Sequence, residues 1–533
     1  MKVTDYIVAF LEAQHIPYVF ELSGGMITHL LDSFARRGTI PLISMHHEQA
    51  AAFAAEAVAR ITGLPGVALA TSGPGATNLL TGIGSCYFDS VPAVFITGQV
   101  NRDEQKGQRH IRQLGFQETD IVAMATPVTK AAWQVSLPDD IPAALTQAFT
   151  LACSGRPGPV LLDIPMDVQR AEITAPSPVP VSVPDRMMLD SSQVAAVLAS
   201  LQSAARPLAL IGGGIRSAGV AHALREFIHR YELPTVFSLM ATDVLATDDP
   251  WRVGVIGTYG NRWANIAVAD SDLLLVLGSR LDVRQTGALV DAFRGERTII
   301  HVDCDEHEIN NRVPGCIPVV ASLPHFFATA LALPGPASSS DHRAWMASLA
   351  ELRARYPDTA ELRNCTGINP NIFMHQLAAA SGQAAVFTTD VGQNQMWAAQ
   401  SLWPNANQRI LTSGGMGSMG FALPAAIGAA FACAPHPVVM IAGDGGMQCN
   451  LQELETVAHH RIPLKMVVVN NGCHGMVRQF QQQYFAGRFP ATVWGYSTPD
   501  FVRIAAAFGI PGLSVSDPAE VENALRWLWQ DPS

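Results

Sequence analysis

Two short polar segments in the last third of the chain combine residue types that bind a metal ion and a diphosphate. Gly443-Asp444-Gly445-Gly446 follows the apolar run 438–442, and Asn470-Asn471 follows the apolar run 465–469. The 24 residues from 446 to 469 are enough for a helix that connects two neighbouring parallel strands. Carboxylate and amide oxygens would then meet at adjacent strand ends, where they suit Mg²⁺, and the glycines let a diphosphate approach the backbone. Two unrelated loop turns are the alternative, since each segment alone is common.

A second candidate site lies in the first third of the chain, where His46-His47-Glu48 precedes an alanine-rich run that continues to Ala57. A glutamate that opens a helix is ordinarily a first-turn acid favoured by the helix dipole. Here the small side chains allow close packing, which keeps water from Glu48, favours its protonated form and suits proton exchange with a weakly basic nitrogen. We interpret His46 and His47 as buried neighbours of Glu48 rather than as catalytic groups, and Glu56 as structural.

The elements that must position these residues repeat one pattern along the chain. Short apolar runs without alternation are followed by small-residue turns and helical stretches, for example at 67–70, 208–211, 273–277 and 438–442. Such runs indicate parallel strands that are covered by helices on both faces. Ligands of such sheets bind at the carboxyl ends of the strands, which is where the glycine-rich turns fall.

The domain organisation follows from two stretches, 174–184 and 334–341, whose proline, glycine and serine content is typical of linkers. We therefore predict an α/β protein with three doubly wound parallel-sheet domains, at 1–170, 188–332 and 345–533.

Composition excludes several classes of protein. Hydrophobic residues make up 48% of the 533 residues and charged residues 15%, which excludes a disordered chain and fits extensive burial that includes a subunit interface. A formal net charge of −11 argues against a nucleic-acid-binding protein, and no apolar run reaches the roughly 20 residues of a membrane span. The first residues read as an amphipathic helix rather than a signal peptide, and the eight scattered cysteines lack a CxxC pair. We expect reduced thiols and a cytoplasmic location.

The longer motifs around these segments resemble those of the thiamine-diphosphate enzymes, and most closely the acetohydroxyacid (acetolactate) synthases. The resemblance rests on Thr389-Asp-Val-Gly-Gln-Asn-Gln-Met-Trp-Ala-Ala-Gln, on Thr412-Ser-Gly-Gly-Met-Gly-Ser-Met-Gly-Phe-Ala-Leu-Pro, and on Asn470-Asn-Gly-Cys-His-Gly-Met-Val-Arg-Gln. It runs over nearly the whole chain. It implies an aminopyrimidine-binding first domain, a central domain that could bind FAD, and a last domain that binds the diphosphate and Mg²⁺.

The resemblance also assigns roles to single positions. Asp444, Asn471 and the backbone carbonyl of Cys473 are the expected Mg²⁺ ligands. Met419 is the expected wedge that brings the two rings of the cofactor together, although a methionine is by default core filler. The full set of expected cofactor contacts is Glu48, Val391, Gly392, Gln393, Asn394, Gly417, Met419, Gly443, Asp444, Gly445, Gly446, Asn471, Cys473, His474, Gly475 and Met476.

Glu48 is, by resemblance, the residue that hydrogen-bonds the aminopyrimidine ring and so promotes loss of the thiazolium proton, after which the cofactor acts as the electron sink for decarboxylation of a 2-oxo acid. Gly25 and Gln117 line the pocket of the reacting carbonyl, and Phe116 and Lys130 belong to the expected substrate pocket. Family members build each site from two subunits, which implies a homodimer or homotetramer with active sites at the interface.

The central block carries Gly212-Gly213-Gly214, on its own a weak dinucleotide signal. Further segments similar to the FAD-binding segments of the synthases give the expected flavin contacts Gly212, Gly213, Gly214, Gly257, Arg280 and Asp303. The alternative is a degenerate central domain without flavin.

Some positions depart from the family pattern and leave the acceptor substrate open. Ser23-Gly24-Gly25 replaces Pro-Gly-Gly, followed by Met26 in place of a small residue, and Asn394 replaces a histidine. Phe480 stands where the synthases have an acceptor-pocket tryptophan, whereas Arg284, expected to bind an acceptor carboxylate, is kept. Segment 101–115 is longer and more charged than its family equivalent, and the chain ends at 527–533 without the expected closing strand.

We therefore expect a transferase that decarboxylates pyruvate and adds the two-carbon unit to a second carbonyl compound, acetolactate being the product when that compound is pyruvate. The alternatives are the same donor chemistry with another acceptor, such as a nucleotide-linked keto-sugar, or a pyruvate decarboxylase or oxidase. A non-catalytic cofactor-binding protein fits less well, because a scaffold has no need of a buried acid.

Overall fold

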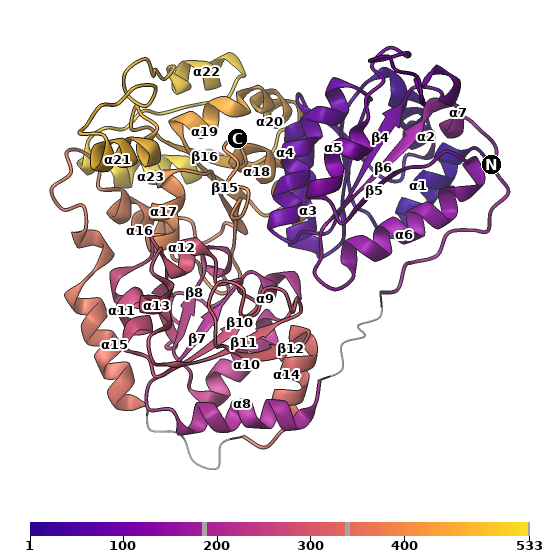
Figure 1. Ribbon diagram of the computed structural model, residues 1–533. Coiled ribbons are helices and arrows are strands. Elements are labelled where there is room, and N and C mark those ends of the chain that lie inside the picture. Colours follow the sequence, from indigo (N-terminus) through magenta and orange to yellow (C-terminus); the bar gives the residue numbers. More distant parts are fainter. Residues whose placement is uncertain (184–188, 336–341, 531–533) are drawn as a thin grey trace.

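The computed structural model describes residues 1–183, 189–335 and 342–530, which form three α/β domains around three separate parallel sheets (Figure 1). This is the predicted fold class. The predicted limits of the domains remain predictions. Three segments lie outside the described residues: 184–188, 336–341 and 531–533. They include the end of the first predicted linker and most of the second. No helix in the described ranges is long and apolar enough to cross a bilayer.

The N-terminal domain contains a six-stranded sheet in which every neighbouring pair is parallel. In spatial order its strands are β2 (Leu42–Ser44), β1 (Val19–Leu22), β3 (Gly66–Ala70), β4 (Ala93–Gln99), β6 (Pro159–Pro165) and β5 (Ala131–Gln134). Its helices are α1 (Val3–Ala13), α2 (Thr28–Arg37), α3 (Glu48–Thr62), α4 (Pro74–Phe88), α5 (Ile121–Ala125), α6 (Ile141–Cys153) and α7 (Met166–Gln169). Strands β3, β4 and β6 are buried along their whole length, which explains their unalternating apolar sequences.

The central domain has a second six-stranded parallel sheet. In spatial order its strands are β12 (Ile317–Val320), β11 (Thr298–Asp303), β10 (Leu273–Leu277), β7 (Pro207–Ile211), β8 (Thr235–Phe237) and β9 (Arg252–Val255). Its helices are α8 (Ser191–Ser203), α9 (Gly214–Ser217), α10 (Ala221–Tyr231), α11 (Arg262–Asp270), α12 (Val283–Thr286), α13 (Val290–Arg294) and α14 (Leu323–Ala332). Helix α15 (Arg343–Arg355) also packs here, since Trp345 and Leu349 join the central core. The predicted third domain begins at 345 and so includes most of this helix.

The C-terminal domain has four parallel strands in the order β14 (Arg409–Thr412), β13 (Val386–Thr389), β15 (Val438–Gly443) and β16 (Leu464–Val469). Its helices are α16 (Pro370–Ala380), α17 (Gln393–Ser401), α18 (Ala422–Cys433), α19 (Asp444–Cys449), α20 (Leu454–His460), α21 (Gly475–Tyr484), α22 (Phe501–Ala507) and α23 (Val521–Gln530). β15 and β16 are direct neighbours, as the spacing of their two polar turns predicts.

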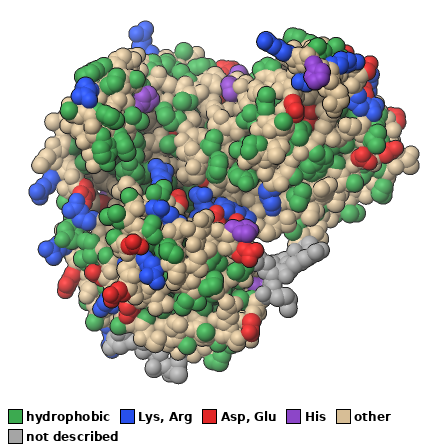
Figure 2. All heavy atoms as spheres, viewed as in Figure 1, with side chains coloured by type: hydrophobic (Ala, Val, Ile, Leu, Met, Phe, Trp, Pro, Cys, Tyr) green, Lys and Arg blue, Asp and Glu red, His purple; other side chains and the backbone are tan. Residues whose placement is uncertain are grey.

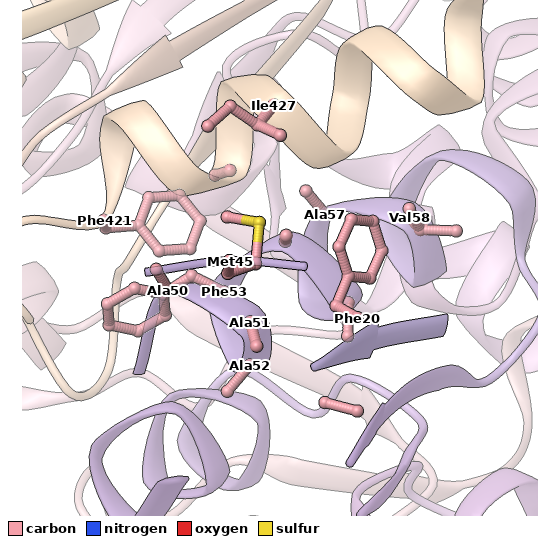
Figure 3. Packing of buried hydrophobic residues seen from close by; sticks show 14 of the residues in the cluster. Phe20, Met45, Ala50, Ala51, Ala52, Phe53, Ala57, Val58, Phe421 and Ile427 are labelled. Carbon is pink, nitrogen blue, oxygen red and sulfur yellow. The ribbon is translucent and has the colours of Figure 1, made fainter. Parts of the chain in front are cut away.

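The N-terminal and C-terminal domains share one hydrophobic core along α3 and α18 (Figure 3). Phe53 of α3 and Phe421 before α18 meet edge to face at 5.3 Å, and Phe20 and Ile427 belong to the same cluster. A Cβ on Gly428 would lie 2.8 Å from the Cα of Ala54 and closer still to its carbonyl, so only glycine allows the helices this approach. The alanine-rich sequence of α3 therefore fixes the position of Glu48 at its first turn.

Candidate active site

The turns after four neighbouring strands bring the expected diphosphate and metal residues to one edge of the C-terminal sheet. Val391 to Asn394 follow β13, and Gly417 and Met419 follow β14. Asp444 follows β15, and Asn471 to Met476 follow β16. The structure thus gathers at this edge all the expected cofactor contacts except Glu48.

The expected metal ligands have preorganised neighbours. Asp444 is 3% exposed, and the hydroxyl of Tyr496 donates to its Oδ2 at 3.0 Å. Asn471 donates from Nδ2 to Gln393 Oε1 at 2.9 Å, and its Oδ1 accepts from the backbone N–H of Cys473 at 3.2 Å. A carboxylate and an amide oxygen suit a hard cation such as Mg²⁺, so these residues fit the expected site.

Some glycines at this edge lie where a side chain would collide with neighbouring side chains. Gly392 has a φ of 149°, a conformation that favours glycine, and it precedes the first turn of α17. A Cβ at Gly445 would lie 2.9 Å from the ring of His474 and 3.1 Å from Met419 Cε, and a Cβ at Gly475 would overlap the amide of Gln393. These turns therefore pack closely against one another, and the turn after β13 leads into the start of a helix, where backbone N–H groups suit an anion such as a diphosphate.

Asp390, the last residue before this turn, joins the two loops of the site. Its carboxylate is 1% exposed and accepts from the backbone N–H groups of Val391 at 2.9 Å, Gly420 at 3.0 Å and Ala422 at 2.9 Å. Burial raises the pKa of Asp390 to about 6, although these three donors lower it. Asp390 thereby holds the diphosphate turn against the loop that carries Met419.

The three expected catalytic residues of the N-terminal domain meet around the turn that joins β3 to α4. A Cβ at Gly24, beside Gly25, would collide with the side chain of Thr71. Gly73 has its closest neighbour in Gln117, and Gly75 faces Glu48, whose Oε1 would lie 3.1 Å from an added Cβ. Residues far apart in sequence are therefore brought together at the carboxyl ends of the strands.

Glu48 is 5% exposed, and Asn78 on α4 donates to its Oε2 at 2.9 Å. His47 caps the helix, because its Nδ1 accepts from the backbone N–H of Gln49 at 3.0 Å. The expectation that His46 is buried is wrong, since its side chain is 43% exposed and its Nδ1 lies 3.0 Å from the hydroxyl of Thr456. Glu48 has no hydrogen bond to the diphosphate residues within the part of the chain that the structure describes.

Other expected pocket residues lie elsewhere in this chain. Lys130 precedes β5, at the edge of the sheet opposite the Glu48 cluster, and its Nζ donates to the carbonyl of Ser154 at 2.6 Å. Phe116 is 80% exposed on the N-terminal domain. Phe480 and Met476 on α21 line a surface pocket of about 560 Å³ that Tyr259 of the central domain also lines.

A larger cavity, of about 810 Å³, lies where the three domains meet. The central domain contributes the turns that follow β7, β8, β10 and β11, all at the carboxyl ends of strands. Of the expected flavin contacts, Gly213, Gly214, Arg280 and Asp303 line this cavity, as does Arg284. Gly212 instead packs tightly against Gly278, and Gly257 packs against the backbone of Arg284. The volume and the strand-end position suit a large nucleotide cofactor.

Charged residues surround this cavity, and Figure 2 shows Lys and Arg side chains gathered where the lobes of the molecule meet. Asp243 receives hydrogen bonds from Arg216 at 3.1 Å and Arg409 at 2.8 Å. Its burial opposes ionisation, but the two guanidinium groups outweigh burial and lower the pKa of Asp243. Asp89, which also lines the cavity, accepts from the backbone N–H groups of Gly414 and Gly415 at 2.9 and 2.7 Å.

Sequence reasoning missed three residues that complete these sites: Asn78, Tyr496 and Asp390. Asp390 lies inside a motif that carries the family resemblance, so its position was visible but its role was not. Asn78 lies in the segment after β3, where no role was assigned to it. Tyr496 lies 52 residues after Asp444 in an irregular segment, and no sequence signal pairs the two.

Comparison with known proteins agrees with this geometry. Residues 1–124, 194–330 and 390–532 match the N-terminal TPP binding domain, the central domain and the C-terminal TPP binding domain of thiamine pyrophosphate enzymes. The chain is 38% identical to the acetolactate synthase isozyme 2 large subunit of Escherichia coli K12, over 98% of this chain and 93% of that protein. It is 38% identical to the acetolactate synthase large subunit of Parasynechococcus marenigrum and 36% identical to that of Mycobacterium tuberculosis, over 98% of this chain and 85% and 84% of those proteins.

Proposed function

Because the chain belongs to the thiamine pyrophosphate enzyme family, we propose that it is a thiamine-diphosphate-dependent carboligase of the acetolactate synthase type. It decarboxylates pyruvate and transfers the two-carbon unit to a second carbonyl compound. The observation that carries this proposal is the presence in one chain of two groups of residues that together would form the active site. One half-site is the buried Glu48 with Gln117 and Gly25, and the other is the open strand-end edge with Asp444 and Asn471.

The residues divide the work of binding and proton transfer. Bound thiamine diphosphate supplies the electron sink for loss of CO₂. Asp444, Asn471 and the carbonyl of Cys473 would hold Mg²⁺, and Gly392 to Asn394 would hold the diphosphate. Glu48 holds or returns a proton at its Oε1, while Asn78 fixes Oε2. Gln117 and Gly25 would shape the site of the reacting carbonyl, and Met419 would contact the cofactor.

We further propose a homodimer in which Glu48 of one subunit faces the diphosphate edge of the other. Two observations support this. The side-chain hydrogen bond of Glu48 comes from Asn78 of its own domain and not from the diphosphate edge of the same chain. Phe116 and Phe480 also expose apolar rings that a second subunit could cover. Glu48→Gln and Asp444→Asn proteins test this when mixed. A hybrid dimer has one site with both changes and one with neither, so about a quarter of wild-type turnover returns. Continued inactivity of a mixture that has exchanged subunits contradicts the shared site.

We propose that FAD occupies the 810 Å³ cavity, with Gly213, Gly214, Arg280 and Asp303 among its contacts. The fit rests on the close backbone approach of the turns after β7 and β10, where a Cβ at Gly214 would lie 2.9 Å from Gly278 Cα. The measurement is the visible absorbance spectrum of the purified protein. A flavin spectrum at one equivalent per chain is expected, and a colourless protein that takes up no added FAD contradicts the assignment.

The proposal also concerns the identity of the acceptor substrate. We favour a second pyruvate, because the relatives named above are acetolactate synthases. Arg284, expected to bind the acceptor carboxylate, is kept in the sequence and lies on the wall of the cavity proposed for FAD. The experiment supplies pyruvate, Mg²⁺ and thiamine diphosphate and identifies the product. Acetolactate is expected. Acetaldehyde or peroxide would instead indicate a decarboxylase or an oxidase, and CO₂ release only after addition of another ketone would indicate an acceptor such as a nucleotide-linked keto-sugar.

A further inference from the structure

Two strands of the N-terminal sheet direct polar side chains onto a buried carboxylate on the strand between them, and the proposed reaction does not use this carboxylate. Asp163 on β6 is 1% exposed and lies in register with Thr97 on β4 and Gln134 on β5. It accepts from Thr97 Oγ1 at 2.7 Å and from the Nε2 atoms of Gln99 and Gln134 at 3.0 Å each. An ionised carboxylate only accepts hydrogen bonds, so a ring of donors suits it.

The side-chain amide of Gln99 connects this carboxylate to the segment that follows β4. One Nε2 hydrogen goes to Asp163, and the other goes to the carbonyl of Thr119 at 2.8 Å. The Oε1 atom accepts from the backbone N–H of Val100 at 3.0 Å. The amide therefore has one favourable orientation, because a reversed amide would direct its oxygen at two other oxygens.

Thr119 closes the turn that carries Gln117. The N–H of Ile121 donates to the Thr119 carbonyl at 2.9 Å, and the hydroxyl of Thr119 donates to the Gln117 carbonyl at 3.4 Å. Gln117 has a φ of 64°, a left-handed conformation that a non-glycine residue keeps only when its surroundings impose it. Gly73 faces it from the other side, where an added Cβ would lie 2.9 Å from Gln117 Cβ.

We propose that Asp163 is a positioning residue that acts through Gln99 to hold the 115–119 turn and so places Gln117 at the reacting carbonyl. The catalytic part of this inference rests on the proposed function, whereas the anchoring of the turn does not. Burial raises the pKa of Asp163 to about 6, with a further increase from Asp120, while the donors Gln134, Thr97 and Gln99 lower it. The carboxylate is therefore ionised, and accepts only, at neutral pH.

Three variants separate positioning from general stability. Gln99→Met removes the connection to Thr119 at similar side-chain size. Asp163→Asn weakens the acceptor of the Gln99 amide, because a neutral amide oxygen accepts less strongly than a carboxylate oxygen. Gln134→Met is the matched control, because it removes the other amide from the same carboxylate but leaves the connection to the turn intact.

The first measurement is hydrogen exchange of the amides of Glu118 and Ile121, which donate within the turn. Exchange is expected to be about tenfold faster in Gln99→Met and Asp163→Asn, because the turn opens locally, and unchanged in Gln134→Met. This measurement needs neither substrate nor turnover. Unchanged exchange in Gln99→Met, or equal acceleration in Gln134→Met, overturns the positioning role.

The second measurement is pyruvate turnover in the holoenzyme. Displacement of Gln117 is expected to lower kcat/KM about 10- to 100-fold in Gln99→Met. The double variant Asp163→Asn, Gln99→Met should have a kcat/KM no lower than that of the less active single variant. Apparent thiamine diphosphate affinity stays within about twofold, because the residues proposed to hold the diphosphate and Mg²⁺ lie in another sheet. Multiplying effects in the double variant, or loss of cofactor affinity, contradict the inference. Absent wild-type turnover together with faster exchange in Gln99→Met rejects the proposed function alone.

Discussion

The close contact between α3 and α18 permits a quantitative prediction, because it places Glu48 relative to the loop that carries Met419. In Gly428→Ala the added Cβ would lie 2.8 Å from both the Cα and the carbonyl carbon of Ala54. Ordinary contact begins at 3.4 Å, so the helices must separate by at least 0.6 Å, since backbone atoms cannot rotate away.

The expected cost is the balance of two effects. Overpacking of this kind destabilises by about 1–3 kcal/mol, whereas alanine in place of glycine within a helix gains about 0.5–1 kcal/mol. We expect a net loss of about 1–2 kcal/mol, together with lower turnover because the shift reaches both half-sites. Thermal unfolding of the purified variant measures the loss of stability, and pyruvate turnover measures the loss of activity.

Gly84→Ala on α4 is the matched control for this prediction. Its Cβ would meet only the end of the Met416 side chain, at 3.3 Å from Cε, and that flexible side chain can move. We expect unchanged stability, or a gain of up to about 1 kcal/mol. Equal or higher stability of Gly428→Ala, with the control behaving as described, would refute the close packing of α3 on α18.

Two further predictions concern polar groups at the diphosphate edge. Burial raises the pKa of Asp390 from 3.8 to about 6, so the stability that its protonated form provides is fully present below about pH 4 and is lost as the pH rises through 6. Over that range the free energy of unfolding of the wild type should fall by about 3 kcal/mol relative to that of Asp390→Asn. Parallel shifts of the two thermal midpoints with pH would contradict this. Tyr496→Phe removes the donor to Asp444 Oδ2 and should weaken Mg²⁺ binding about 10- to 100-fold, measured by titration of activity against Mg²⁺. An unchanged titration would show that Tyr496 does not orient the metal ligand Asp444.

The overall architecture could be predicted because its signals are local and repeated. Unalternating apolar runs such as 438–442 identify buried parallel strands, and the turn at Asp444 must then lie at a strand end. The neighbourhood of β15 and β16 followed from the length of the connection between them. In these cases one segment of sequence determines both the element and the position of its polar residue.

Contacts between distant segments could not be predicted in this way. Nothing near Tyr496 indicates that its hydroxyl reaches Asp444, and the exposure of His46 depends on how the C-terminal domain meets α3. Asp163 reads as a polar interruption in an apolar strand, and its donors become visible only from the register of β4, β5 and β6. Such contacts are set by tertiary packing, which a single sequence without aligned relatives does not encode locally.

We propose that Glu48 transfers the proton that cofactor activation requires, and a comparison of two glutamates on the same helix tests this role. Glu48→Gln and Glu56→Gln both neutralise a buried carboxyl of α3, but Glu56 pairs with Arg60 and lies outside the cluster around Gly75. Pyruvate turnover is measured with saturating Mg²⁺ and with thiamine diphosphate binding confirmed. We expect about 10²- to 10⁴-fold lower turnover in Glu48→Gln and near wild-type turnover in Glu56→Gln. Full turnover by Glu48→Gln with bound cofactor would contradict it.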